Sequence, residues 1–205
     1  MAPKPELKVT VFSDYICPFC YIGDARLNRL RDDYDLKVNW CFLEIHPETP
    51  AEGEPVTSLD YSSEQWRRMM DTLAVMATEE GLPLGDHEFT TNSRSALLLA
   101  EAAKPAGAAV FYRLHAAIFE AFFVRGENIG DRALLRELAL AAGMDSDAID
   151  AAWQGGGMEK RLRAYALAAH ELQVRATPTF FIGRQRLNGA VPVQRLTDAA
   201  RAALA

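Results

Sequence analysis

Two cysteines with two residues between them lie where a short strand gives way to a helix, and this placement constrains the fold most. Residues 7–13 (LKVTVFS) are an apolar, β-branched run that predicts a strand. A helical pattern follows from Cys20 to about Arg31, and residues 36–45 predict a second strand covered on both faces. Strand, helix and strand in this order indicate the opening unit of an α/β fold.

The motif Cys17-Pro18-Phe19-Cys20 has the spacing of a redox-active dithiol. A helix N-terminus presents unpaired N–H groups and the positive end of the helix dipole, so it stabilises a thiolate and lowers the pKa of its thiol. Cys17 is therefore predicted as the nucleophile, and Cys20, one turn further on, as the thiol that resolves a mixed disulfide. Asp14 would oppose the activation of Cys17, because a nearby carboxylate raises the pKa of a thiol; by residue type it is equally a turn or cap residue.

Two other interpretations of the cysteines stay open. Zinc usually takes four ligands in close pairs, and the further candidates here, Cys41 and His46, do not have that spacing, so no metal is predicted. The motif cysteines could also be inert and buried. Cys41, in the middle of the second strand, is expected to be a buried free thiol, and His46 a structural or exposed residue.

The middle of the chain predicts helices. A loop rich in Pro, Gly and Glu spans residues 47–60, and a capping-box pattern at residues 62–65 opens a helical region of about a hundred residues. Met69, Met70 and Met76 recur there at helical spacing and are interpreted as core residues, unless the helices cover Cys17. Strand character returns at residues 179–187 before a terminal helix. We therefore expect one small mixed sheet, interrupted by a helical insertion.

Thr177-Pro178, just before the strand at residues 179–182, is the second candidate site. A cis bond before Pro178 would leave the backbone of Thr177 free to pair with an extended substrate. Most X–Pro bonds are trans, so the dipeptide carries meaning only together with the upstream cysteine motif. Pro18, Phe19, Thr177 and Pro178 are predicted to contact substrate.

Composition excludes several partners. The formal net charge is −6 and no basic cluster is present, so nucleic acid is not expected. No apolar run reaches the length of a membrane span, so no membrane partner is expected. The first residues lead into a strand instead of a signal-peptide core, and three cysteines are too few for a disulfide scaffold, so we expect a cytoplasmic protein. Because the sulfur atoms carry the electrons, no cofactor is expected.

The order of these features resembles the DsbA-like thioredoxin-fold proteins, and in particular the FrnE-type subgroup. The matching stretches are residues 12–23 (FSDYICPFCYIG), 43–53 (LEIHPETPAEG), 176–183 (ATPTFFIG), 188–192 (NGAVP) and the helical region 119–129. The resemblance spans nearly the whole chain. It implies that Cys17 is the nucleophile, Cys20 the resolving thiol and Pro178 the cis proline.

The resemblance also implies an α/β thioredoxin fold with a large all-helical insertion. Residues 1–60 and 172–205 would form the thioredoxin-like domain, and residues 61–171 the insertion, whose last helix is a candidate to pack on the sheet. Three positions depart from the family pattern. Ala176-Thr177 replaces the usual Gly-Val, Gln173 stands where Gly is frequent, and Phe19 where Trp is common. These departures bear on substrate preference and redox potential.

The function expected from these features is thiol–disulfide exchange with protein or small thiol substrates, with glutathione as a further candidate partner. The oligomeric state is not predicted. One alternative shares the fold: glutathione-dependent isomerases and transferases that resemble 2-hydroxychromene-2-carboxylate isomerase and kappa-class glutathione transferase use a serine near the position of Cys17. The presence of both cysteines favours dithiol chemistry. Another alternative is a non-catalytic, redox-responsive binding module.

Overall fold

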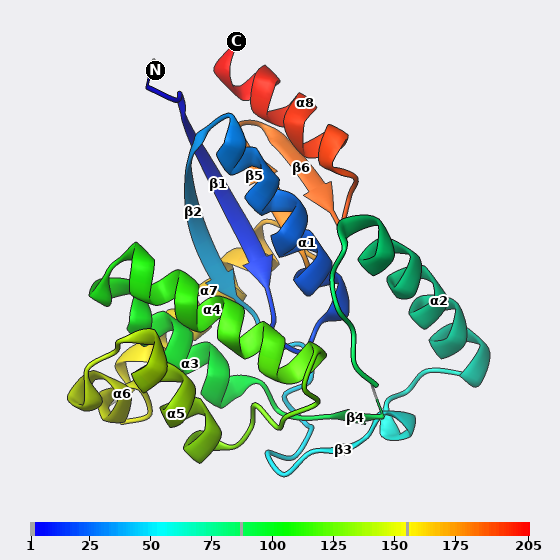
Figure 1. Cartoon of the computed structure of the whole chain (residues 1–205), viewed down its shortest axis with the longest axis vertical. Helices are drawn as coiled ribbons and strands as arrows, with labels where there is room; N and C mark the ends of the chain where they lie inside the picture. The colour runs from blue at the N-terminus through cyan, green and yellow to red at the C-terminus, as the bar shows by residue number, and fades with distance from the viewer. Residues whose placement is uncertain (1–2, 87, 155) are drawn as a thin grey trace.

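A four-stranded mixed sheet forms the centre of the computed structural model, which describes residues 3–86, 88–154 and 156–205. The strand order is β2 (Asp35–Phe42), β1 (Glu6–Ser13), β5 (Thr179–Ile182) and β6 (Gln185–Asn188). β1 runs parallel to β2 and antiparallel to β5, and β6 is antiparallel to β5. The two ends of the chain therefore build one sheet (Figure 1), and the predicted α/β class is confirmed.

Helices occupy both faces and one end of this sheet. They are α1 (Pro18–Asn28), α2 (Ser63–Glu80), α3 (Arg94–Ala103), α4 (Ala108–Phe123), α5 (Arg132–Ala142), α6 (Ser146–Ala152), α7 (Gly157–Glu171) and α8 (Val193–Leu204). A small ladder of β3 (Glu54–Pro55) and β4 (Phe89–Thr90) joins the loop after β2 to the segment before α3, so a short strand also lies within residues 61–171. Among the described residues, no helix is long and apolar enough to cross a membrane.

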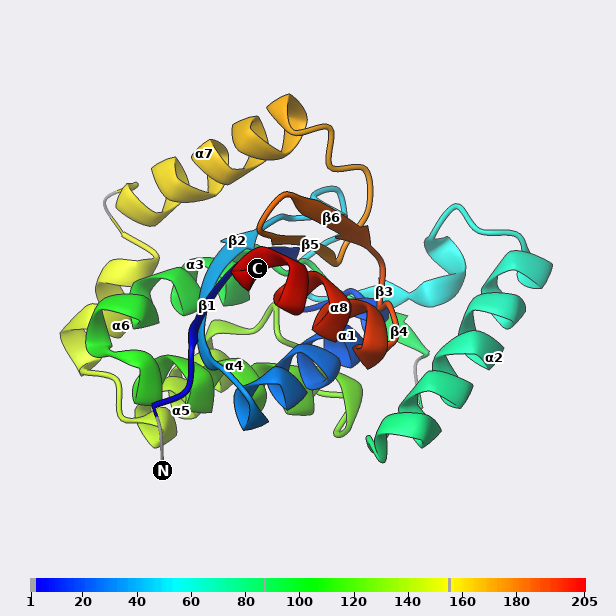
Figure 2. The same ribbon diagram turned by 90° about the horizontal axis from the view of Figure 1, so that it is seen from above.

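Alternation along β1 explains the layers of the fold. Val9 and Val11 point to one face, where they join the main core with residues of α1 and α8. Phe12 points to the other face and packs with Cys41 and with Ala169 of α7. Seen from above, α7 lies on one side of the sheet, and α1 and α8 on the other (Figure 2). The last helix of the predicted insertion thus packs on the sheet.

The prediction that the second strand is covered on both faces is wrong for its first half. Lys37 and Asn39 are exposed, whereas Leu36 is buried in the main core. Burial on both sides begins at Trp40 and Cys41, where α7 lies over the sheet. Coverage by α7 is a tertiary feature, which the apolar composition of the strand does not encode.

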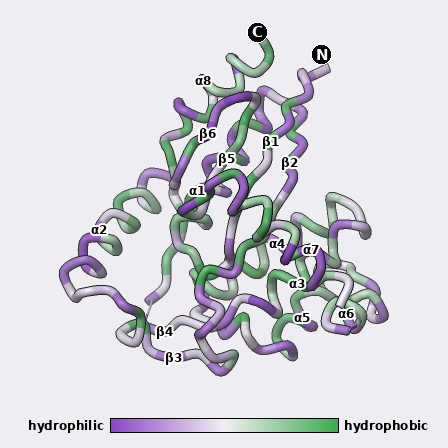
Figure 3. Tube along the Cα trace, turned by 180° about the vertical axis from the view of Figure 1, so that it is seen from behind, coloured by the Kyte–Doolittle hydropathy of each residue, from purple (hydrophilic) through white to green (hydrophobic). Residues whose placement is uncertain are grey.

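α2 stands apart from the other helices and is held against α1. Its predicted capping box is present: Gln65 N–H donates to Ser62 Oγ at 3.2 Å, and Ser62 N–H donates to Gln65 Oε1 at 2.9 Å. Arg26 of α1, itself buried, donates to Glu80 near the end of α2 at 2.9 Å. In Figure 3 the tube of α2 mixes hydrophilic and hydrophobic residues, as expected for a helix with one covered side. The other side of α2 faces solvent.

The boundaries of the two predicted domains stay a prediction. One continuous cluster of buried side chains runs from Val11 and Trp40 of the sheet into α3, α4 and α5. The helices therefore share a core with the sheet, and no break in packing marks residue 61 or residue 172.

Candidate active site

Cys17 lies at the N-cap of α1, immediately after the carboxyl end of β1. Its backbone is extended (φ −84°, ψ 113°), and its carbonyl accepts the N–H of Cys20 at 2.9 Å. Pro18 occupies the first turn, where a residue without an N–H donor is well tolerated. The motif thus begins at the helix N-terminus, where unpaired amides and the helix dipole stabilise negative charge.

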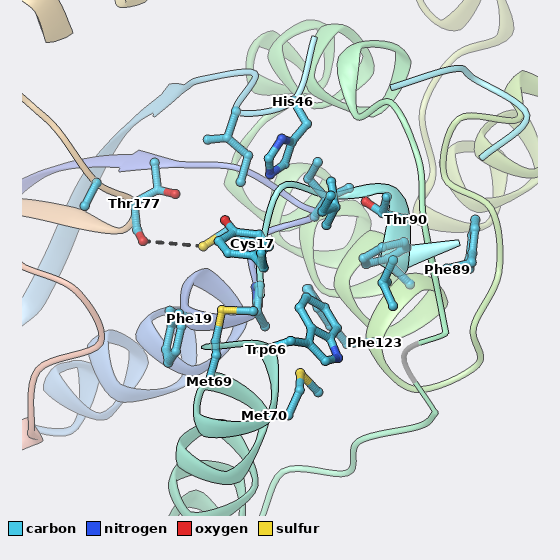
Figure 4. A pocket seen from close by; sticks show the side chains of 18 of the residues that line it. Cys17, Phe19, His46, Trp66, Met69, Met70, Phe89, Thr90, Phe123 and Thr177 are labelled. Carbon is cyan, nitrogen blue, oxygen red and sulfur yellow. Dashed lines mark hydrogen bonds between the residues drawn. The ribbon is translucent and has the colours of Figure 1, made fainter. Parts of the chain in front are cut away.

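The two thiols of the motif lie in different surroundings. Cys17 is 5% exposed and lines a cavity, whereas Cys20 is 1% exposed and lies behind it in the core. As a thiol, Cys17 donates to the backbone carbonyl of Thr177 at 3.4 Å, across a sequence separation of 160 residues (Figure 4). The two predicted site segments, far apart in sequence, therefore meet at the sulfur of Cys17.

Hydrogen bonding and burial separate the acidities of these thiols. The pKa of Cys17 is lowered, chiefly because the Cys20 thiol donates a hydrogen bond to its sulfur; burial opposes this, while the Thr177 side chain and the Cys20 amide reinforce it. The pKa of Cys20 is raised well above its usual value by burial and by its hydrogen bond and charge interaction with Cys17. Because the thiolate is the nucleophile, this asymmetry favours Cys17 as the attacking thiol.

Asp14 is fully buried beneath the motif. Ile45 N–H donates to its Oδ2 at 2.8 Å and Ile16 N–H to its Oδ1 at 3.3 Å, so the carboxyl group fixes the backbone on both sides of the site. Burial raises the pKa of Asp14 from 3.8 to about 6, although the hydrogen bond from Ile45 lowers it. Its charge in turn raises the pKa of Cys17. Both sequence interpretations of Asp14 therefore hold: it organises the turn, and it moderates the thiol.

Brief alkylation at pH 7 is expected to label Cys17 much faster than Cys20 or Cys41. Burial raises the pKa of Cys41 to about 11, so only about one thiol in ten thousand is ionised at that pH. Cys20 is both more buried and less acidic than Cys17. Peptide mapping after short exposure to iodoacetamide measures the three rates. Similar labelling of all three cysteines in the native protein would show that the acidity order is wrong.

A cavity of about 370 Å³ opens beside Cys17 (Figure 4). This volume is within the range of pockets that hold small molecules or single side chains. Its walls are mostly apolar and come from the start of α1, the β3–β4 region, the first turns of α2 and the end of α4. The apolar lining residues are Ile16, Pro18, Phe19, Ile45, Val56, Leu59, Tyr61, Trp66, Met69, Met70, Phe89, Phe122, Phe123 and Ala176.

The residues predicted to contact substrate fall into two groups. Pro18, Phe19 and Thr177 line this cavity together with Cys17. Pro178 is buried, and the peptide bond between it and Thr177 is cis. Its ring lies against Gly23 of α1, where an added Cβ would come within 2.8 Å of Pro178 Cγ. Pro178 therefore supports the loop from below, while Thr177 faces the cavity.

Gly23→Ala is expected to destabilise the protein by about 1–3 kcal/mol, because the new methyl group overlaps the ring of Pro178. The substitution should also displace Thr177 from Cys17 and slow thiol exchange. Gly157→Ala, at the exposed start of α7 with open space around it, is the matched control. It should stabilise by up to about 1 kcal/mol through helix propensity. Denaturant unfolding of both variants measures the difference, and equal stabilisation would contradict this packing.

The interpretation of Met69 and Met70 as core residues is wrong for Met69 and incomplete for Met70. Both are half-buried and line the cavity with Trp66, and Met70 also packs, like Met76, against the small core under α2 that contains Leu73. The sequence placed these residues on one helix face but did not show that the face is shared between a core and a cavity. This outcome was expected only if the helices cover Cys17, and α2 does lie beside it.

His46 was also not expected in the site, yet it lines the cavity opposite the side chains of α2 (Figure 4). Its Nδ1 lies 3.1 Å from Glu48 Oε1 at the exposed rim. Cys41 is buried and free, as expected, but lies on the other face of the sheet from the motif. Among the described residues, no group of three His, Cys, Asp or Glu side chains could hold a metal ion.

Comparison with known proteins shows the family to which the chain belongs. Residues 8–201 match the model described as a DSBA-like thioredoxin domain. The chain belongs to the DsbA-like thioredoxin family. A relative in Bacillus subtilis, the uncharacterized protein YwbO, is 28% identical over 186 residues, which cover 89% of this chain and 90% of YwbO.

Solved structures share this DsbA-like fold. A probable DsbA oxidoreductase from Streptomyces coelicolor, SCO1869, superposes with a TM-score of 0.83 at 24% identity, covering 97% of this chain and 90% of that one. The cytosolic disulfide reductase DsbM from Pseudomonas aeruginosa, solved with GSH, gives 0.67 at 21% identity, with 97% of both chains covered. A 2-hydroxychromene-2-carboxylate isomerase gives 0.69 at 22% identity, covering 96% and 94%. These likenesses show the thioredoxin-type fold expected from the sequence.

Proposed function

We propose that this DsbA-like protein is a thiol–disulfide oxidoreductase in which Cys17 attacks and Cys20 resolves. The observation that carries the proposal is the asymmetry of the pair. Cys17 has a lowered pKa, stands at a helix N-terminus and faces a cavity, whereas Cys20 has a raised pKa and is buried one turn behind it. This is the arrangement that a two-step exchange requires.

In the reducing direction, the Cys17 thiolate attacks one sulfur of a substrate disulfide. The substrate S–S bond breaks, and its other sulfur leaves as a thiolate that takes a proton from water. Cys20 then loses its proton and attacks Cys17 Sγ, which forms the Cys17–Cys20 disulfide and releases the second substrate thiol. Two electrons pass from the protein to the substrate, and the same steps in reverse oxidise a dithiol.

The substrates that we propose are protein disulfides and small thiols. In the described part of the chain the amide N–H of Thr177 has no hydrogen-bond partner, so it is available to an extended substrate backbone. The apolar cavity could then take an apolar group beside the substrate cysteine. Glutathione is a reasonable partner, since DsbM shares the fold and was solved with GSH. Membership of the FrnE-type subgroup and a cytoplasmic location are parts of the same proposal.

The second candidate function is a glutathione-dependent isomerase or transferase, favoured by the fold likeness to 2-hydroxychromene-2-carboxylate isomerase. Such a protein would bind glutathione without electron exchange. Glutathione binding to Cys17→Ser, measured by calorimetry, together with wild-type protein that never forms a Cys17–Cys20 disulfide, would favour this function over ours.

Catalysed reduction of a peptide disulfide by glutathione tests the proposed function. Wild-type protein should accelerate the reaction over the uncatalysed exchange, and Cys17→Ser should lose the acceleration. A wild-type protein without any acceleration, but with measurable peptide binding, would indicate the non-catalytic binding module. Cys41→Ser is the matched control and should keep the wild-type rate, because Cys41 is buried on the other face of the sheet.

A further inference from the structure

A second groove lies on the other side of Thr177 from the apolar cavity. Its volume is about 570 Å³, and the two hollows share four lining residues, which are Ile45, Arg175, Ala176 and Thr177. The segment 175–177 is therefore a narrow wall between them. A substrate joined to Cys17 and paired with Thr177 would meet both hollows.

The second groove differs from the cavity in its charge. Three arginines line it, Arg94, Arg163 and Arg175, together with His170, against a single carboxylate, Glu44. The whole chain has a formal net charge of −6, so a groove with more positive than negative side chains differs from the chain as a whole. Glu44 and Glu159 offset two of the three arginine charges, and the positive charge that remains attracts ligands of the opposite sign.

Arg175 is the groove arginine whose charge is free. Arg94 is paired with Glu44 at 2.7 Å and with Glu159, and Arg163 lies 3.9 Å from Glu159. Among the described residues, neither Arg175 nor the His170 side chain has an ion-pair or hydrogen-bond partner, and both are exposed. Arg175 stands two residues before Thr177, and two residues of extended chain span about 7 Å.

We propose that Arg175 is a specificity residue that selects disulfides carrying a carboxylate a few bonds from the reacting sulfur. The guanidinium group presents paired N–H donors that match a carboxylate. With the substrate sulfur at Cys17 and its backbone beside Thr177, a carboxylate close to that sulfur falls within reach of Arg175. The inference rests on the proposed function, since the substrate must react at Cys17. Free glutathione and an acidic peptide both offer this chemistry.

Three small disulfides of similar size and different charge test the proposal. They are 3,3′-dithiodipropionate (anionic), bis(2-hydroxyethyl) disulfide (neutral) and cystamine (cationic). In a Cys20→Ser background the mixed disulfide at Cys17 persists, so its rate of formation can be followed by quenched mass spectrometry. Arg175→Gln should slow the anionic disulfide roughly two- to fivefold, the range for an exposed ion pair. It should leave the neutral one unchanged and speed cystamine.

Arg184→Gln is the matched control. Arg184 is also exposed and lies in the turn after β5, at the far end of that strand from Thr177, so its loss changes the net charge equally. It should leave all three rates unchanged. Equal slowing of all three disulfides by Arg175→Gln would mean that Arg175 acts on the acidity of Cys17, and no change would mean that it does not contact substrate; either result overturns the proposal. If the neutral disulfide does not react even with Arg175 present, the proposed function itself fails.

The same variants distinguish the two sources of carboxylate. Glutathione disulfide is compared with a disulfide-linked peptide that has glutamate beside cysteine, and with its glutamine counterpart. A loss confined to glutathione disulfide in Arg175→Gln supports a small-thiol substrate. A loss confined to the glutamate peptide supports an acidic protein segment. If Arg175→Gln affects neither, and the glutamine peptide reacts as fast as the glutamate peptide, the selection of carboxylates by Arg175 is refuted.

Discussion

Cys20→Ser is expected to accumulate covalent adducts through Cys17, whereas Cys17→Ser is expected to form almost none. In the proposed mechanism Cys20, which lies one turn behind Cys17, displaces the substrate from the mixed disulfide. A tethered thiol has an effective concentration far above that of free thiols in solution, so its loss should lengthen the life of the adduct by about a thousandfold or more. This is the largest effect that the structure predicts.

Cys17→Ser should fail for a different reason. The remaining motif thiol, Cys20, is 1% exposed and its pKa is raised well above the usual value, so few thiolates are present at neutral pH and few substrates reach them. Cys41 does not replace it, because its pKa of about 11 and its place under α7 keep it unreactive. Non-reducing gels of both variants, followed by mass spectrometry of the linked cysteine, measure the difference. Adducts that map mainly to Cys20 or Cys41 would overturn the assigned roles.

Asp14→Asn is expected to stabilise the protein by up to about 3 kcal/mol at pH 7.5. Asp14 has a pKa of about 6 in the folded protein and about 3.9 in an unfolded chain, so the folded state binds its proton more tightly. Stability from this group is therefore greatest below pH 4 and falls as the pH rises to about 6, above which the full penalty applies. The rise in the pKa of Asp14 from about 3.9 to about 6 on folding corresponds to a loss of about 3 kcal/mol of folding stability above pH 6.

The amide of Asn has no charge to desolvate, and its oxygen can still accept the N–H of Ile45. Its NH2 group cannot accept the N–H of Ile16 as Oδ1 does, and this lost hydrogen bond offsets part of the gain at every pH. The stability gain should therefore shrink to a small fraction near pH 4, where Asp14 is protonated in the folded state and about half protonated in the unfolded chain. Urea unfolding of wild type and variant across pH 4 to 8 measures it. Asp71→Asn, on the exposed side of α2, is the control and should change stability little. A gain that is the same at pH 4 and pH 7.5 would show that the buried charge of Asp14 is not its cause.

The sequence predicted the features that are local in the chain. The strand before Cys17, the helix that begins at the motif, and the capping box at Ser62 follow from short-range patterns, and the structure has all three. Cys41 as a buried free thiol followed from its place in a strand. Thr177-Pro178 was predicted to act together with the cysteine motif, but no local pattern places Thr177 against Cys17, 160 positions away.

The cavity could not be predicted in the same way. Met69 and Met70 have the periodicity of a packed helix face, and only the position of α2 beside the motif turns them toward Cys17. His46 enters the site through the loop after β2, whose path no pattern fixes. Arg175 looks like any other arginine in the sequence. It stands out only in the structure, where the neighbouring Arg94 is paired with carboxylates and Arg175, within the described part of the chain, is not. Positions set by tertiary packing are thus the ones that sequence analysis missed.

Redox equilibration of the wild-type protein in glutathione buffers shows whether Cys17 and Cys20 form a reversible redox pair. Samples poised at a series of glutathione ratios are quenched by alkylation, and the state of each cysteine is read by peptide mapping. The roles proposed for Cys17 and Cys20 predict a reversible two-electron transition between a dithiol and one Cys17–Cys20 disulfide, with Cys41 a free thiol throughout. A motif that stays reduced across the whole series, or a disulfide that involves Cys41, would contradict it.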